Sequence, residues 1–143
     1  MQKKMRNKIG FYLLSFTWGF PMTIVGLVVA IVLIIMGHKP TTLHHRMHFK
    51  VGKRWGGVSL GTVIITDQNP TNHTLKHELG HTVQNVWFGP LFPLLVGVPS
   101  VIRYWYRKLL IRSGQSDLPP YDAIWFEGQA SELGNKYFTI QND

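Results

Sequence analysis

Residues 11–36 read FYLLSFTWGFPMTIVGLVVAIVLIIM and contain no charged side chain. This run of 26 residues is longer than the roughly 20 that an α-helix needs to cross the hydrocarbon core of a bilayer. Pro21 lies inside the run, where neighbouring groups can absorb a kink. The run is too long for the apolar part of a secretory signal, and no small-x-small cleavage site follows it. We therefore expect a retained transmembrane helix, with residues 1–38 forming a basic N-terminus and its anchor.

A second apolar stretch covers residues 86–102, again without charge, but Pro90, Pro93 and Pro99 interrupt it. Its 17 residues are at the lower limit for a span, so a re-entrant or interfacial segment and a short second span remain equally compatible with it. Basic residues follow it within residues 103–112. We expect residues 86–112 to associate with the membrane.

The composition of the 143 residues agrees with one small domain plus an anchor. Only 15% of residues are charged and 45% are hydrophobic, which excludes a disordered chain, and the absence of cysteine excludes disulfides and thiolate metal sites. The net charge is +8, but the basic residues flank the apolar stretches. This placement predicts anionic membrane lipids as partners and no nucleic acid. Similar numbers of basic residues on both sides of residues 11–36 leave the membrane orientation undetermined.

The remaining residues predict a mainly α membrane protein with one small β-hairpin. The hairpin comprises strands at residues 49–55 and 58–66 with a turn at Gly56-Gly57. Helices are expected at residues 73–87 and 121–138, and residues 113–120 read as a linker. Residues 39–143 would thus form one compact domain behind the anchor.

The pattern H-E-x-x-H occurs at His77, Glu78 and His81 within the first of these helices. Residues four apart share a helix face, so both imidazoles can bind one ion. Glu78 lies one step round the helix, where it can take a proton from an attacking water without being a ligand. Neutral imidazoles suit Zn²⁺. Gly80 is a costly helix residue, by about 1 kcal/mol against Ala, so we expect close packing on its face.

A third ligand must come from elsewhere in the chain. The metzincin motif H-E-x-x-H-x-x-G-x-x-H requires a glycine and a third histidine where this chain has Gln84 and Trp87, which excludes that class. A site-2-type protease would use an aspartate from a later membrane segment, but residues 86–102 contain no acid. Gluzincins use a glutamate from a downstream helix. The acids beyond His81 are Asp117, Asp122, Glu127, Glu132 and Asp143.

Glu127 is the first residue of the sequence EGQASELG at residues 127–134. This resembles the E-x-x-A-D-x-x-G segment of membrane-associated gluzincin zinc metallopeptidases. The sequences HELGHT at residues 77–82 and GPL at residues 89–91 also look like motifs of a group of small membrane proteins. The resemblance implies one Zn²⁺ held by His77, His81 and Glu127, with Glu78 as general base. Where the family has an aspartate that orients a ligand imidazole, this chain has Ser131, which can form that hydrogen bond more weakly.

The leading hypothesis is a membrane-anchored zinc metalloendopeptidase that cuts membrane-associated polypeptides near the bilayer surface. Peptide hydrolysis also needs a donor for the oxyanion, for which Tyr121 and His73 are candidates by proximity. The strand at residues 58–66 could bind substrate by edge pairing. The alternative is a non-catalytic membrane protein with a structural or regulatory zinc site. A carboxylate such as Glu78 beside the ligands favours the enzyme.

Overall fold

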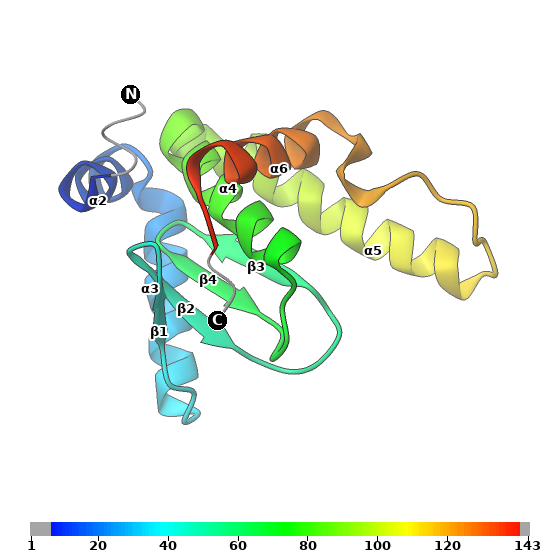
Figure 1. Ribbon diagram of the computed structural model, residues 1–143, viewed down its shortest axis with the longest axis horizontal. Coiled ribbons are helices and arrows are strands. Elements are labelled where there is room, and N and C mark those ends of the chain that lie inside the picture. The colour runs from blue at the N-terminus through cyan, green and yellow to red at the C-terminus, as the bar shows by residue number, and fades with distance from the viewer. Residues whose placement is uncertain (1–6, 141–143) are drawn as a thin grey trace.

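The computed structural model describes residues 7–140 and shows a mainly helical chain with a small sheet (Figure 1). The α-helices are α2 (Lys8–Thr17), α3 (Phe20–Ile35), α4 (Asn72–Phe88), α5 (Val98–Arg112) and α6 (Trp125–Tyr137). The strands are β1 (Thr41–Leu43), β2 (Arg46–Lys50), β3 (Gly57–Leu60) and β4 (Val63–Thr66).

The apolar run at residues 11–36 forms two helices, so the prediction of a single helix is wrong. α2 and α3 meet at a bend of 100°. The chain breaks at Trp18 and Gly19, because Pro21 takes a place in the first turn of α3, where its missing N–H costs nothing. Between residues 7 and 140, no individual helix combines the length and the apolar composition that crossing a bilayer requires. Two bent helix pairs meet these criteria only when each pair is counted together.

The sheet has four strands in the order β1-β2-β4-β3, which corrects the expected single hairpin. The predicted first strand ends at Lys50, and the turn lies at Gly61, with a φ of 64°, rather than at Gly56-Gly57. A loop after β2 reverses the chain, so that β2 pairs parallel with β4 while β3 pairs antiparallel with it. β1 and β2 form a second hairpin through His44 and His45, both at positive φ. Histidine is an uncommon residue for such a turn, and the sequence gives no signal for it.

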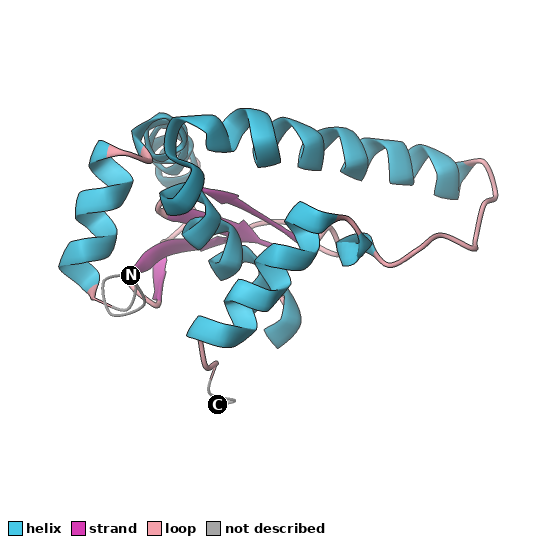
Figure 2. Cartoon of the chain, turned by 90° about the horizontal axis from the view of Figure 1, so that it is seen from above, coloured by secondary structure: helices cyan, strands magenta, loops and turns pink. Residues whose placement is uncertain are grey.

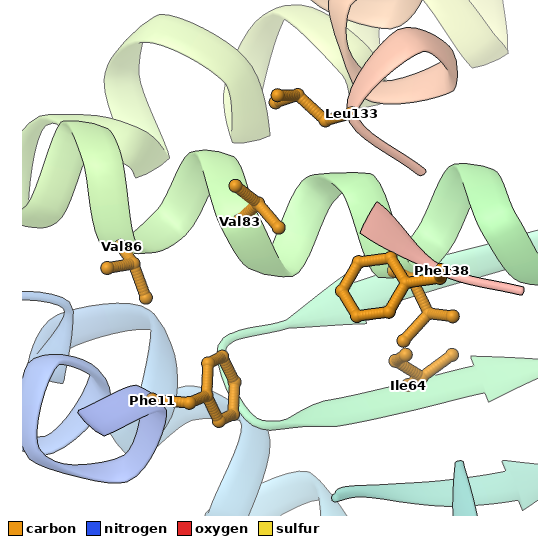
Figure 3. Close-up of a cluster of buried hydrophobic side chains, with 7 residues drawn as sticks. Phe11, Ile64, Val83, Val86, Leu133 and Phe138 are labelled. Carbon is orange, nitrogen blue, oxygen red and sulfur yellow. The ribbon is translucent and has the colours of Figure 1, made fainter. Parts of the chain in front are cut away.

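The sheet lies between α3 on one face and α4 on the other. Strand β4 is buried throughout, and its side chains alternate: Ile64 joins a cluster with α4, while Val63 and Ile65 pack with Ala30 and Leu33 of α3. In the first cluster, Figure 3 shows side chains from α2, β4, α4 and α6 gathered together. This packing fixes α4 against the sheet and α6 against α4.

α4 and α6 approach each other closely at two glycines. A Cβ atom at Gly80 would lie 1.8 Å from the carbonyl oxygen of Ala130, and one at Gly134 would lie 1.9 Å from that of Lys76. The close packing expected at Gly80 is therefore confirmed. α4 spans almost the predicted residues, with the Thr71 side chain accepting a hydrogen bond from the Thr74 N–H at 3.1 Å. The last predicted helix begins instead as a 3₁₀ turn, Tyr121–Ala123, and continues as α6.

The second apolar stretch is also bent. After α4 come a 3₁₀ turn (Gly89–Leu91), a π-helical turn (Pro93–Gly97) and α5, and the segments before and after the break at Phe92 meet at 118°. α5 has no buried residue and extends away from the sheet, and residues 113–120 return as an irregular linker (Figures 1 and 2). Arg103 and Arg107 fasten this linker by donating hydrogen bonds to the carbonyl oxygens of Pro119, Pro120 and Tyr121.

Candidate metal centre

The structure brings His77, His81 and Glu127 together in the buried space between α4 and α6. His77 and His81 are on one face of α4, and Glu127 is in the first turn of α6. The Nε2 atoms of the two histidines are 3.1 Å apart. Glu127 Oε2 lies 3.0 Å from His77 Nε2 and 3.2 Å from His81 Nε2. This group could hold a metal ion.

The spacing of these three atoms fits a tetrahedral ion. Ligand bonds of 2.0–2.1 Å place any two tetrahedral ligands about 3.3–3.4 Å apart. The three observed separations, 3.0 to 3.2 Å, are only slightly shorter. A small relaxation would therefore suffice to bind an ion with these three ligands.

Gln84 fixes the proton on the imidazole of His81. Gln84 Nε2 donates to the backbone carbonyl of Phe126 at 2.7 Å, so Gln84 Oε1 faces His81 Nδ1, also at 2.7 Å. A carbonyl oxygen only accepts, so His81 Nδ1 carries the proton. The Nε2 atom of neutral His81 then directs a lone pair toward Glu127.

Ser131 and Asp122 do the same for His77. Ser131 Oγ donates to Asp122 Oδ2 at 3.3 Å, so it accepts from His77 Nδ1 at 2.9 Å. Position 131 is a serine and not an aspartate, and Asp122 supplies the carboxylate one hydrogen bond further from His77. The Nε2 of neutral His77 also presents a lone pair to the centre.

Three lone-pair atoms meeting at this distance repel one another unless a cation lies between them. Without a metal ion, a proton must fill this role. Burial lowers the pKa of His81, but the hydrogen bond to Glu127 and the charges of Glu78 and Glu127 outweigh it and raise this pKa. Burial likewise raises the pKa of Glu127, but hydrogen bonds from His77 and His81 and the His81 charge hold it far below its ordinary value. The electrostatics of the centre therefore favour a positive charge.

The second oxygen of Glu127 is also bonded. Ser100 Oγ, near the start of α5, donates to Glu127 Oε1 at 2.6 Å. This contact turns Oε2 toward the histidines and ties α5 to the centre. The supporting roles of Gln84, Ser100 and Asp122, and of Ser59 described below, were not predicted from the sequence, in which Asp122 was only one of five acids beyond His81. Of these, only Gln84 carried a signal, its position three residues after His81 on the same helix.

Glu78 is buried beside the centre, and a residue of the sheet forms a hydrogen bond with its carboxylate. The hydroxyl of Ser59 in β3 lies 2.8 Å from Glu78 Oε2 and 2.7 Å from the Glu78 backbone oxygen. β3 packs against α4, and this packing places the Ser59 hydroxyl beside Glu78. Glu78 is oriented by this contact and belongs to the wall of the same cavity as the three ligands.

The two candidate donors are placed differently. The Tyr121 ring lies 6.5 Å from the His77 ring, and Arg103 and Arg107 lie over its face. Burial, followed by the charges of Glu127 and Glu78, raises the pKa of Tyr121, so its hydroxyl stays protonated. His73 stacks on His77 at 6.1 Å but is largely exposed, and its Nε2 lies 3.8 Å from Asp122 Oδ2.

A cavity of about 810 Å³ opens onto the centre. Its lining includes His77, Glu78, His81 and Glu127, the strand β3, and apolar residues of α3 and α5. An ion held by the three ligands would therefore be accessible to a sizeable molecule. Comparisons of the chain with protein-family models, curated proteins and solved structures found no match.

Proposed function

We propose that this protein is a membrane-attached zinc peptidase of gluzincin type. The observation that carries the proposal is the convergence of His77 Nε2, His81 Nε2 and Glu127 Oε2, with each histidine's Nδ1 proton directed away from the centre. Two imidazoles and one carboxylate are a ligand set that catalytic zinc sites use. The cavity beside them leaves room for a substrate, which a purely structural site does not need.

A bound zinc ion would act as a Lewis acid that lowers the pKa of a coordinated water. Glu78 would accept a proton on its carboxylate and return it to the leaving amine. Ser59 holds one oxygen of this carboxylate, so the side chain is already oriented. The protonated hydroxyl of Tyr121 would donate a hydrogen bond to the developing oxyanion.

The strand β3 supports binding of an extended peptide. It is at one edge of the sheet, and all four of its residues line the cavity. An added strand would pair with its free edge and lie next to Glu78. This free strand edge supports a peptide backbone as the proposed substrate.

Exposed apolar side chains support membrane attachment. α2, α3 and the segment from Leu91 to Ile111 carry large hydrophobic residues that are more than 40% exposed, among them Leu13, Val28, Ile31, Leu94, Ile102 and Leu109. Soluble monomers rarely expose apolar surface on this scale. A lipid bilayer would cover it.

The test begins with metal content. Purified wild-type protein should bind about one zinc ion per chain, and Glu127→Ala should bind far less, because two imidazoles hold zinc poorly. Glu132→Ala, on the exposed side of α6, is the matched control and should bind zinc like the wild type. Equal zinc binding by Glu127→Ala would remove the proposed ligand.

Catalysis is tested separately with Glu78→Gln. The amide has nearly the same shape but cannot accept the proton, so zinc binding should persist while peptide hydrolysis falls by at least about 10²–10⁴-fold. His77→Ala should lose both zinc and hydrolysis. If the wild type binds zinc yet behaves like Glu78→Gln with every peptide, the centre is structural or regulatory.

A further inference from the structure

We propose that the protein is inserted into one leaflet of an anionic bilayer through the outer faces of α3 and α5, and that residues 11–36 do not cross the membrane. This inference rests on the membrane attachment proposed above and not on the peptidase chemistry. It identifies the partner surface and the way in which the cavity meets it.

The inner face of α3 packs against the sheet. Gly26 lies so close to β3 that a Cβ atom there would be 2.1 Å from the carbonyl oxygen of Leu60. Further along, Ala30 and Leu33 are buried in a cluster with Val63 and Ile65 of β4. α3 therefore contacts the sheet over most of its length.

This contact prevents α3 from crossing a bilayer. A spanning α3 would carry the sheet into the hydrocarbon core, with the backbone N–H and C=O groups of its edge strands β1 and β3 away from water. Unpaired backbone groups in lipid cost several kcal/mol each, and open sheet edges do not occur there. Only the outer face of α3 is free to contact lipid.

That outer face is apolar, and α5 carries a matching stripe. On α3, Ile24, Val28, Ile31 and Ile35 recur at helical spacing and are 53 to 79% exposed. On α5, the exposed residues Val98, Val101, Ile102, Trp105 and Leu109 recur at intervals of three or four. The two helices border one cavity, because Val25 of α3 and Val101 of α5 both line it. The two helices thus present apolar surface on either side of the cavity.

The charges around these stripes are positive. The sequence has no acidic residue before Asp67 and none from residue 79 to residue 116. Lys8 is the first residue of α2, Lys39 follows α3, and Lys108 and Arg112 are at the end of α5. Apolar helix faces whose neighbouring charges along α2, α3 and α5 are all positive complement anionic headgroups above a hydrocarbon layer. The cavity would then open at the level of the headgroups or just below them.

Cysteine labelling tests this topology directly, since the chain contains no cysteine. Lys8→Cys and Lys39→Cys place single thiols on the two sides of residues 11–36 and remove one positive charge each. Each full-length variant is produced in bacterial cells, and sealed right-side-out and inside-out membrane vesicles from these cells are treated with a membrane-impermeant maleimide before and after detergent. We expect the two thiols to react alike, both before detergent in one kind of vesicle and both only after detergent in the other.

Protection of only one of the two thiols in the same kind of vesicle until detergent is added would show that residues 11–36 cross the bilayer and would overturn the proposal. Failure of the protein to float with the vesicles would overturn membrane attachment itself. Zinc binding and hydrolysis, measured on the same samples, report on the proposed function independently.

Insertion depth gives a second readout. A fluorophore at Ile31→Cys should be quenched by lipids carrying a nitroxide on the acyl chain, whereas one at Glu132→Cys, on the exposed side of α6, should not. Equal quenching at the two sites, or none at Ile31→Cys, would contradict insertion of the α3 face.

Discussion

The imidazoles of His77 and His81 are held by different partners, and this difference is testable. His81 Nδ1 donates to an amide carbonyl of Gln84, while His77 Nδ1 donates to the hydroxyl of Ser131, which Asp122 supports. Loss of a group that orients a metal-bound histidine typically weakens metal binding by about 10–100-fold. The chain from Ser131 to Asp122 predicts graded effects of the two residues.

Ser131→Ala should lower zinc affinity by about 10–100-fold, because His77 loses its acceptor entirely. Asp122→Asn should have a smaller effect, since Ser131 can still accept from Nδ1. Ser131→Asp, which introduces a carboxylate in direct reach of His77 Nδ1, should keep or strengthen binding. Competition with a chromophoric chelator measures all three, with Ser113→Ala on the exposed linker as control. Wild-type affinity in Ser131→Ala would show that this hydrogen bond does not orient the ligand.

The pH dependence of zinc affinity follows from the raised pKa of His81. Zinc must displace the proton that His81 holds in the metal-free protein, so affinity should fall as the pH drops below this raised pKa, by about tenfold per pH unit for each proton displaced. Chelator competition across this range measures the slope. A zinc affinity that does not change with pH would contradict the shared proton.

The free energy of unfolding of the metal-free protein should depend on pH in the opposite sense, falling as the pH rises through the raised pKa of His81. The raised pKa of His81 stabilises the fold fully below its ordinary value of 6.5, and this contribution is lost as the pH rises through the raised value. The lowered pKa of Glu127 contributes fully above its ordinary value of 4.5 and is lost at lower pH. Both contributions are therefore complete between about pH 4.5 and 6.5, and zinc should stabilise the fold most at higher pH.

At the scale of elements, the centre depends on how closely α4 and α6 cross. Gly80→Ala adds a Cβ that would lie 1.8 Å from the Ala130 carbonyl, so the helices must separate and Glu127 must move from the histidines. This cost should exceed the gain of about 1 kcal/mol in helix propensity. We expect a lower melting temperature and lost zinc affinity. Gly97→Ala is the control, because its Cβ would lie 3.3 Å from the end of the flexible Met22 side chain and 3.8 Å, an ordinary contact distance, from the Phe92 carbonyl oxygen.

The sequence predicted α4 well but misjudged the elements around it. The H-E-x-x-H spacing and the capping residue Thr71 are local signals, and both describe α4 correctly. The two faces of α3 cannot be told apart in residues 11–36, because the face packed on the sheet and the face exposed outward are both apolar. The usual helical period of polar and apolar residues is therefore missing. The hairpin was misplaced because Gly56-Gly57 and Gly61 are equally plausible turns locally. Only long-range pairing of β2 with β4 decides between them.

At the scale of the whole molecule, α3, α5 and β3 form walls of one cavity that the proposed ligands also line. Two of these walls would contact lipid, and the third offers a strand edge. A substrate in the same membrane would therefore reach the centre by diffusion in two dimensions. Its effective concentration at the cavity would exceed that of the same sequence free in solution.

This arrangement predicts that one peptide is cut faster when it is tethered to the membrane. On vesicles containing phosphatidylserine, an acylated peptide should be cleaved with at least about tenfold higher apparent kcat/KM than its unacylated form, because linked partners reach effective concentrations near the millimolar range. In detergent micelles that hold each protein separately, the advantage should shrink. Glu78→Gln should cleave neither form, which assigns the activity to the centre. Equal cleavage of both peptides on vesicles would mean that the apolar walls do not deliver substrate from the membrane.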